Sequence, residues 1–133
     1  MRGDMLEMTE GELQRGIVEC AEWHGWMAYH VTNVKETLLT YNTTAPGFQD
    51  WNLVHAERAL IVYAELKRKG KQPTAKQRAW GQAVALAARF CPERVYSVLW
   101  KPEHYDEAID FLMGRTNVPP GIVKVDLNKR EWS

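Results

Sequence analysis

The sequence predicts a single α/β domain in which helices pack on the faces of a mixed β-sheet. The chain has 133 residues, 45% of them hydrophobic, which is enough for one compact core and too little for two. Segments with helical or strand character follow one another in the order helix, three strands, helix, strand, helix. Both longer helices begin at capping boxes. Together these features are typical of a mixed sheet covered by helices.

The first helix is predicted to begin after Thr9 and to end near Gly25. Thr9 has the character of an N-cap, and Glu12 stands at the third helical position, where its side chain completes a capping box. Glu10 falls near the middle of the apolar face. On a helical wheel that face contains Leu13, Ile17, Ala21 and His24.

Three strands are expected next. Residues Trp26 to Val34 alternate with the two-residue period of a strand, and Ala59 to Lys67 form a run rich in β-branched and aromatic residues. A shorter strand, Trp51 to His55, is predicted between them. The connection from Lys35 to Asp50 is unusually long and rich in Thr and Asn, so we expect it to border the functional site.

The second half of the chain repeats the helix and strand pattern. Its predicted elements are a helix that begins at the capping box Thr74 to Gln77 and ends near Phe90, a strand from Val95 to Trp100, and a helix from about Glu103 to Met113 that stops at Gly114. We therefore expect one domain over residues 1–114. The C-terminal tail, 115–133, has no predicted role, and its candidate strand, Ile122 to Leu127, has no predicted place.

Composition and cysteine spacing give no signal for a strongly charged partner, a zinc site or a membrane span. Lys plus Arg number 17, and Asp plus Glu also number 17, so the net charge points to no nucleic-acid or membrane partner. Cys20 and Cys91 lack the spacing of a zinc site, and we interpret both as buried thiols. Without an apolar leader or a membrane-length apolar run, the sequence predicts a soluble cytoplasmic protein.

The main chemical signal is Glu65 followed two residues later by Lys67. In a strand both side chains point to the same face. Magnesium takes oxygen ligands and retains several waters, so Glu65 and a second acid would suffice to hold it. Asp50 is the best second acid, because a hairpin would bring it beside Glu65. The alternative is an ordinary salt pair on a half-exposed strand, which is commoner for an isolated E-x-K.

Two further side chains are candidates for the same site, each with a structural alternative. Glu10 on an apolar face needs a partner, which a shared metal would provide, or else it reaches solvent and complements the helix dipole. Gln77 either holds a water or phosphate or only completes its capping box.

A dense group of basic residues follows Lys67. We expect it to contact the phosphates of a polyanion, although charged turns are usually only solvated. Its members are Arg68, Lys69, Lys71, Lys76 and Arg78. The histidines, by contrast, show no metal or triad pattern, and the chain has no Gly-rich phosphate loop or nucleophile elbow.

The ordered pieces of the sequence resemble the VRR-NUC-type branch of the PD-(D/E)XK nuclease superfamily, in particular its small stand-alone phage and bacterial members. The matching pieces are Thr9-Glu10-Gly11-Glu12-Leu13-Gln14, Gly25-Trp26, Tyr29-His30, Gly47-Phe48-Gln49-Asp50, Glu65-Leu66-Lys67, Pro73-Thr74, Gln77, Trp80 and Val98-Leu99-Trp100-Lys101-Pro102. Gln49 departs from the pattern, because family members usually have proline before the aspartate.

The resemblance implies a restriction-endonuclease-like fold with an α-β-β-β-α-β core, and DNA cleavage with Mg²⁺ or Mn²⁺. Asp50 and Glu65 then look like the metal-binding acids, with the Leu66 carbonyl as a further ligand and Lys67 as the catalytic lysine. By the same resemblance, Glu10 is the acid of the first helix. Gln77 is the glutamine of the helix after the site.

The resemblance implies a divalent-metal-dependent deoxyribonuclease in a bacterial or phage-infected cell. Some similar proteins are directed to branched or junction DNA, which we expect here, and others act at nicks or flaps. Recognition of two-fold junctions favours a homodimer. Tyr41, Trp51 and Trp80 are candidates for stacking on an unpaired base, or are core residues. The first alternative is a non-catalytic DNA-binding or interaction module. The second is an unrelated α/β domain, which a large distance between Asp50 and Glu65 would favour.

Overall fold

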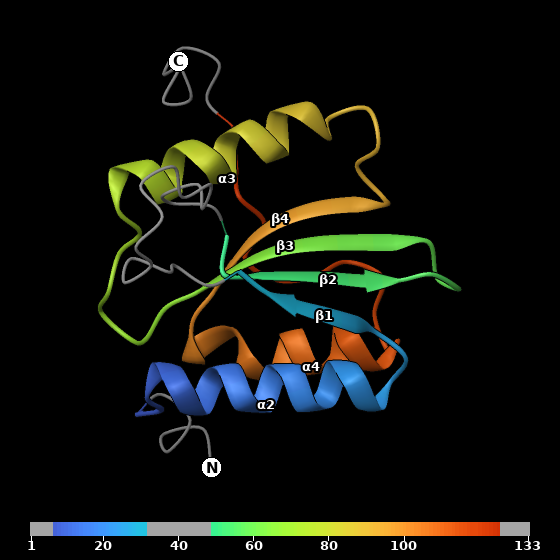
Figure 1. The fold of residues 1–133 in the computed structure, drawn as a ribbon, viewed down its shortest axis with the longest axis horizontal. Helices are drawn as coiled ribbons and strands as arrows, with labels where there is room; N and C mark the ends of the chain where they lie inside the picture. Colours follow the sequence, from blue (N-terminus) through green and yellow to red (C-terminus); the bar gives the residue numbers. More distant parts are fainter. Residues whose placement is uncertain (1–6, 32–48, 126–133) are drawn as a thin grey trace, which may run out of the picture.

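The computed structural model describes residues 7–31 and 49–125, which form a four-stranded mixed sheet with helices on both faces (Figure 1). In chain order the elements are α2 (Glu10–Trp23), β1 (Met27–His30), β2 (Trp51–His55), β3 (Leu60–Leu66), α3 (Ala75–Ala87), β4 (Val95–Trp100), the 3₁₀ helix η1 (Pro102–His104) and α4 (Tyr105–Met113). The predicted mixed sheet flanked by helices is therefore confirmed.

The strands follow one another across the sheet in the order β1-β2-β3-β4. The first three are antiparallel neighbours, with Met27 opposite Val54 and Trp51 opposite Ala64. Strand β4 runs parallel to β3. A parallel pair needs a crossover, and α3 provides it.

Helices α2 and α4 cover one face of the sheet, and α3 covers the other face over β3 and β4 (Figure 1). The apolar face predicted for the first helix is buried at three of its positions. The buried core contains Leu13, Ile17, Ala21, Trp26, Leu53, Leu60, Val62, Ala64, Leu66, Tyr96, Val98, Trp100, Ala108, Phe111 and Leu112. Burial of this apolar area is the main force that holds the helices against the sheet.

Both predicted capping boxes are present. The Glu12 amide donates to Thr9 Oγ1 at 3.0 Å, and the Glu12 carboxylate accepts from the Thr9 amide at 2.9 Å. The Thr74 and Gln77 pair does the same at 3.1 and 2.8 Å. These bonds satisfy amides that have no partner within the helix. Local sequence therefore decided where α2 and α3 begin.

Several element ends differ from the predictions. Trp26 precedes β1 because its amide donates to the Ala21 carbonyl of α2 at 3.0 Å and not to a neighbouring strand. Its buried indole donates to the Leu112 carbonyl at 2.9 Å. Helix α3 ends at Ala87, before Phe90. The last helix is preceded by the 3₁₀ turn Pro102–His104, and it ends as predicted at Gly114, which has a φ of 87°. Residues 32–34, predicted as strand, lie outside the described part.

The tail beyond Gly114 joins the domain. Ile122 forms an isolated antiparallel bridge with Val98, and Gly121 accepts from the Leu99 amide at 2.9 Å. A Cβ at Gly121 would collide with the Leu99 carbonyl oxygen. The segment from 115 to 125 therefore packs beside β4, whereas 126–133 lie outside the described residues.

The expectation that both cysteines are buried is wrong for one of them. Cys91 is exposed, because it lies in the turn after α3, and Cys20 is partly buried on α2. In the described ranges, no helix is long and apolar enough to cross a membrane.

Candidate metal and phosphodiester site

Asp50 and Glu65 lie side by side at one end of the sheet. The β2 and β3 pairing places Trp51 opposite Ala64, so the residue before Trp51 faces the residue after Ala64. The Leu66 amide donates to Asp50 Oδ2 at 3.1 Å, which fixes the Asp50 carboxylate against β3. The hairpin proposed from the sequence therefore brings the two acids together. The large separation that would favour an unrelated domain is not observed.

Glu65 is a buried carboxylate, with 5% of the residue exposed. Its Oε2 accepts from Gln77 Nε2 at 2.9 Å and lies 3.6 Å from Lys67 Nζ. Its Oε1 is buried without a hydrogen-bond partner among the described residues. Burial, reinforced by the negative charge of Asp50, raises the pKa of Glu65 to about 8, although Lys67 opposes the shift.

Glu65 and Lys67 point to the same side of the strand, as their spacing predicted. The residues between and before them, Leu66 and Ala64, are fully buried in the core. The Lys67 side chain is 16% exposed, and its amide donates to the Trp100 carbonyl at 3.0 Å. The pair is therefore not the half-exposed surface salt bridge of the alternative interpretation. Its acid is buried, and its lysine is held at a strand end.

Gln77 has two structural roles at once. Its Oε1 accepts from the Thr74 amide to complete the capping box, and its Nε2 donates to Glu65 Oε2. These two bonds fix the orientation of the amide, because one end must accept and the other must donate. The capping alternative is confirmed, and it coexists with a contact to the acid. Gln77 is thus a residue that positions Glu65.

The donor set fits a hard divalent cation. Two carboxylates face each other at the sheet end, and a buried oxygen of Glu65 lacks a partner. A cation between them would satisfy that oxygen and relieve the repulsion from Asp50. Over the described ranges, no group of three or more His, Cys, Asp or Glu side chains is placed to hold a metal. Two carboxylates are a ligand number that an ion such as Mg²⁺, which retains several waters, is able to use.

Glu10 does not share this environment. It is exposed at the first residue of α2, whereas the sequence placed it on the apolar face. Helical side chains point toward the N-terminus, so Glu10 at the first residue projects past the end of α2 into solvent, as the solvent alternative states. Figure 1 shows the start of α2 at the same end of the sheet as the end of β3, on the face opposite α3.

The basic residues predicted to contact phosphate are exposed around the same sheet end. They lie in the connection from β3 to α3 and in the first turn of α3 (Figure 1). They are Arg68, Lys69, Lys71, Lys76 and Arg78. The guanidinium of Arg78 also donates to the Pro73 carbonyl at 2.9 Å. A polyanion bound at Asp50 and Glu65 would therefore meet positive charge beside these acids.

The rings of all four histidines have structural partners. The rings of His24, His55 and His104 each bond to a backbone group at 2.8 to 3.1 Å. His30 stacks on Trp51, with ring centroids 4.6 Å apart.

Two of the three aromatic candidates for base stacking fall in the described ranges. Trp51 is half-buried against His30, and Trp80 is 37% exposed on α3. Tyr41 lies outside those ranges, as does most of the long Lys35 to Asp50 connection that was expected to border the site.

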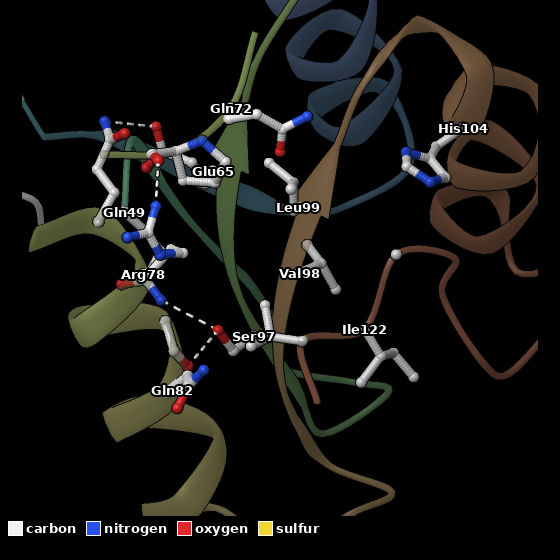
Figure 2. Close-up of a pocket in the computed structure, with 15 residues that line it drawn as sticks. Gln49, Glu65, Gln72, Arg78, Gln82, Ser97, Val98, Leu99, His104 and Ile122 are labelled. Carbon is white, nitrogen blue, oxygen red and sulfur yellow. Dashed lines mark hydrogen bonds between the residues drawn. The ribbon is translucent and has the colours of Figure 1, made fainter. Parts of the chain in front are cut away.

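A pocket of about 390 Å³ opens beside Glu65, between α3, β4 and the segment after Gly121 (Figure 2). Gln49, Glu65 and Arg78 gather on one side of it, and Val98 and Ile122 lie toward the other. Sequence analysis treated Gln49 only as a departure from a family pattern. The signal it missed is tertiary, because Gln49 is 1% exposed and bonds to Ser97 on a strand distant in sequence.

Comparison with known proteins leaves the family of this chain open. No protein-family model, no curated protein and no solved structure matches it.

Proposed function

We propose that the chain is a divalent-metal-dependent deoxyribonuclease that hydrolyses phosphodiester bonds at Asp50 and Glu65. The observation that carries the proposal is the pair of adjacent carboxylates in which one buried oxygen of Glu65 has no partner. Burial of an acid beside a second acid destabilises the fold, and groups of this kind are concentrated at functional sites. A cation-dependent reaction on a phosphate ester would require such a pair of acids.

Asp50, Glu65 and the Leu66 carbonyl would hold Mg²⁺ or Mn²⁺, whose chemistry there is to activate water and to neutralise charge on the phosphate. Asp50 is held in place by the Leu66 amide, and Glu65 is held by Gln77. These bonds fix the acids before the substrate arrives, which limits the reorganisation required during reaction. Glu10 enters the proposal only through the family resemblance.

Lys67 supplies a positive charge next to the reacting phosphate. Its Nζ lies 3.6 Å from Glu65 Oε2, so the lysine is held beside the acid. In the proposal a cation there stabilises the negative charge that develops in the transition state. Lys67 is equally placed to position the attacking water or to remove its proton.

The basic side chains between β3 and the first turn of α3 support a polyanionic substrate. These side chains are exposed, and contacts of such side chains with phosphates would give affinity without sequence specificity. The family resemblance favours branched or junction DNA and a homodimer with two sites. We include this substrate shape and this oligomeric state in the proposal.

The experiment that tests the proposal is cleavage of labelled duplex, single-stranded, flap and four-way-junction DNA with Mg²⁺, with Mn²⁺ and with chelator. Lys67→Ala is the test variant, and Lys124→Ala is its matched control, because Lys124 is an exposed lysine outside the proposed site and outside the basic group. Cleavage that requires the metal and Lys67, and survives Lys124→Ala, supports the nuclease. Binding of DNA by folded protein without any cleavage would overturn it in favour of a non-catalytic DNA-binding module.

A further inference from the structure

The pocket beside Glu65 contains a hydrogen-bond acceptor of fixed direction. Gln49 Nε2 donates to Ser97 Oγ at 3.1 Å, and Ser97 Oγ donates to the Gly81 carbonyl at 2.9 Å. A serine hydroxyl has one hydrogen, and here the Gly81 carbonyl accepts it. Ser97 can therefore only accept from Gln49. The Gln49 amide is held with its nitrogen toward Ser97 and its oxygen directed elsewhere.

That oxygen is the unexplained feature of the pocket. Gln49 is 1% exposed, and its Oε1 is buried without a hydrogen-bond partner among the described residues. Buried polar atoms are almost always satisfied by a protein group, a water or a ligand. Gln49 lines the pocket, so a ligand inside it would be able to supply the missing donor.

The walls of the pocket define the kind of ligand that would fit. Its β4 side carries Val98 and Leu99, and Ile122 adds an apolar surface, whereas Gln72, Arg78 and His104 add polar side chains. A partly apolar lining with an acceptor of fixed direction suits a planar heterocycle that carries an N–H group at its edge. The volume of about 390 Å³ is within the range of small-molecule sites.

The position of the pocket narrows the ligand class further. Glu65 forms part of its wall, whereas Asp50 and Lys67 stand outside it. A group that fills the pocket would thus lie immediately next to a phosphate bound at the two acids. A nucleotide has this arrangement, with a planar base attached to a phosphate through a sugar.

We propose that this pocket binds one unpaired nucleobase of the substrate, and that an exocyclic amino group of the base donates to Gln49 Oε1. The assignment of the base to a DNA substrate rests on the proposed nuclease function. A base in a duplex is stacked and paired, and only an unpaired or extruded base enters such a pocket. The pocket would therefore select DNA with unpaired positions.

The test measures the binding of 2′-deoxynucleosides to the whole chain by NMR titration or calorimetry, in the presence of chelator. The probes are deoxyadenosine, deoxycytidine, deoxyguanosine and thymidine. Deoxynebularine, which is deoxyadenosine without its amino group, is the matched ligand. We expect saturable binding of at least one amino-bearing nucleoside. If that nucleoside is deoxyadenosine, deoxynebularine should bind about tenfold more weakly, as expected for loss of one bond to a buried acceptor.

Gln49→Leu removes the acceptor while it keeps the size of the side chain. It should weaken the binding of the selected nucleoside about tenfold. Gln14→Leu, on the helix that covers the opposite face of the sheet, is the matched control and should leave binding unchanged. If Gln49→Leu does not fold, Ser97→Ala replaces it, because this change releases the Gln49 amide from its fixed orientation and should also weaken binding.

No saturable binding of any nucleoside by the folded wild-type chain would overturn the inference. Equal binding by Gln49→Leu and wild type would do the same. The nucleosides have no phosphodiester and the assay has no metal, so these outcomes are independent of the cleavage test. Nucleoside binding without DNA cleavage would refute only the nuclease, and cleavage without nucleoside binding would refute only the base pocket.

Discussion

Replacement of Glu65 by glutamine should stabilise the metal-free protein and abolish its response to divalent cations. Glutamine has the same shape but no charge to bury, and it retains an oxygen that accepts from Gln77. The wild-type carboxyl has a pKa of about 8 in the fold, against an ordinary value of 4.5. Its protonation equilibrium therefore disfavours the folded state at neutral pH, because the unfolded chain ionises freely there.

The size of the effect follows from this shift in pKa. At about 1.4 kcal/mol per pH unit, the unfavourable contribution of Glu65 at pH 7 is about 3 kcal/mol. It grows as the pH rises from 4.5 and becomes constant above about 8, because the folded form has then ionised as well. The pKa shift already includes the favourable charge of Lys67, and burial of the glutamine amide has its own cost, which offsets part of the gain. We expect Glu65→Gln to raise the free energy of unfolding by about 1 to 3 kcal/mol at pH 7.

The assay is urea denaturation in chelator and in saturating Mn²⁺, between pH 5 and pH 9. Glu57→Gln, an exposed glutamate in the β2–β3 turn, is the matched control and should change neither measurement. Mn²⁺ should stabilise the wild type by about 2 to 3 kcal/mol at a hundredfold excess over its Kd, and should not stabilise Glu65→Gln. A variant less stable than wild type in chelator, or equally stabilised by Mn²⁺, would refute the account of Glu65 as a strained metal ligand.

Three further predictions concern the lysines and the segment after α4. Lys67→Ala should lower kcat for DNA cleavage by about 10²-fold to 10⁴-fold, as measured at saturating substrate against Lys124→Ala. A normal rate would remove Lys67 from the chemistry. The double change of Lys69 and Lys71 to alanine should reduce the slope of log Kobs against log salt for duplex binding by about 1 to 2, and an unchanged slope would show that these side chains do not contact phosphates. Gly121→Ala should destabilise the fold by at least about 2 kcal/mol in urea, because its Cβ meets the Leu99 carbonyl oxygen and its φ is 68°, and a neutral effect would contradict the described path of this segment.

The sequence was sufficient wherever the controlling interactions are local. Thr9 and Thr74 begin their helices because a side-chain oxygen three residues from an unpaired amide can satisfy it. The strands Trp51–His55 and Val95–Trp100 match the predicted ranges to the residue. The two-residue period of a strand also placed Glu65 and Lys67 on one face. Interactions of this kind depend on neighbours along the chain, and sequence patterns record them.

Only the tertiary structure decided the environment of these side chains. Asp50 meets Glu65 through strand pairing, and Gln77 reaches the same acid from α3. Glu10 shows the converse, because its place on a helical wheel suggested burial and its place at the helix start left it exposed. The bond from Gln49 Nε2 to Ser97 on β4 fixes the direction of the Gln49 amide oxygen. Burial and pKa depend on which distant segments pack together, and the pattern of one segment does not contain that information.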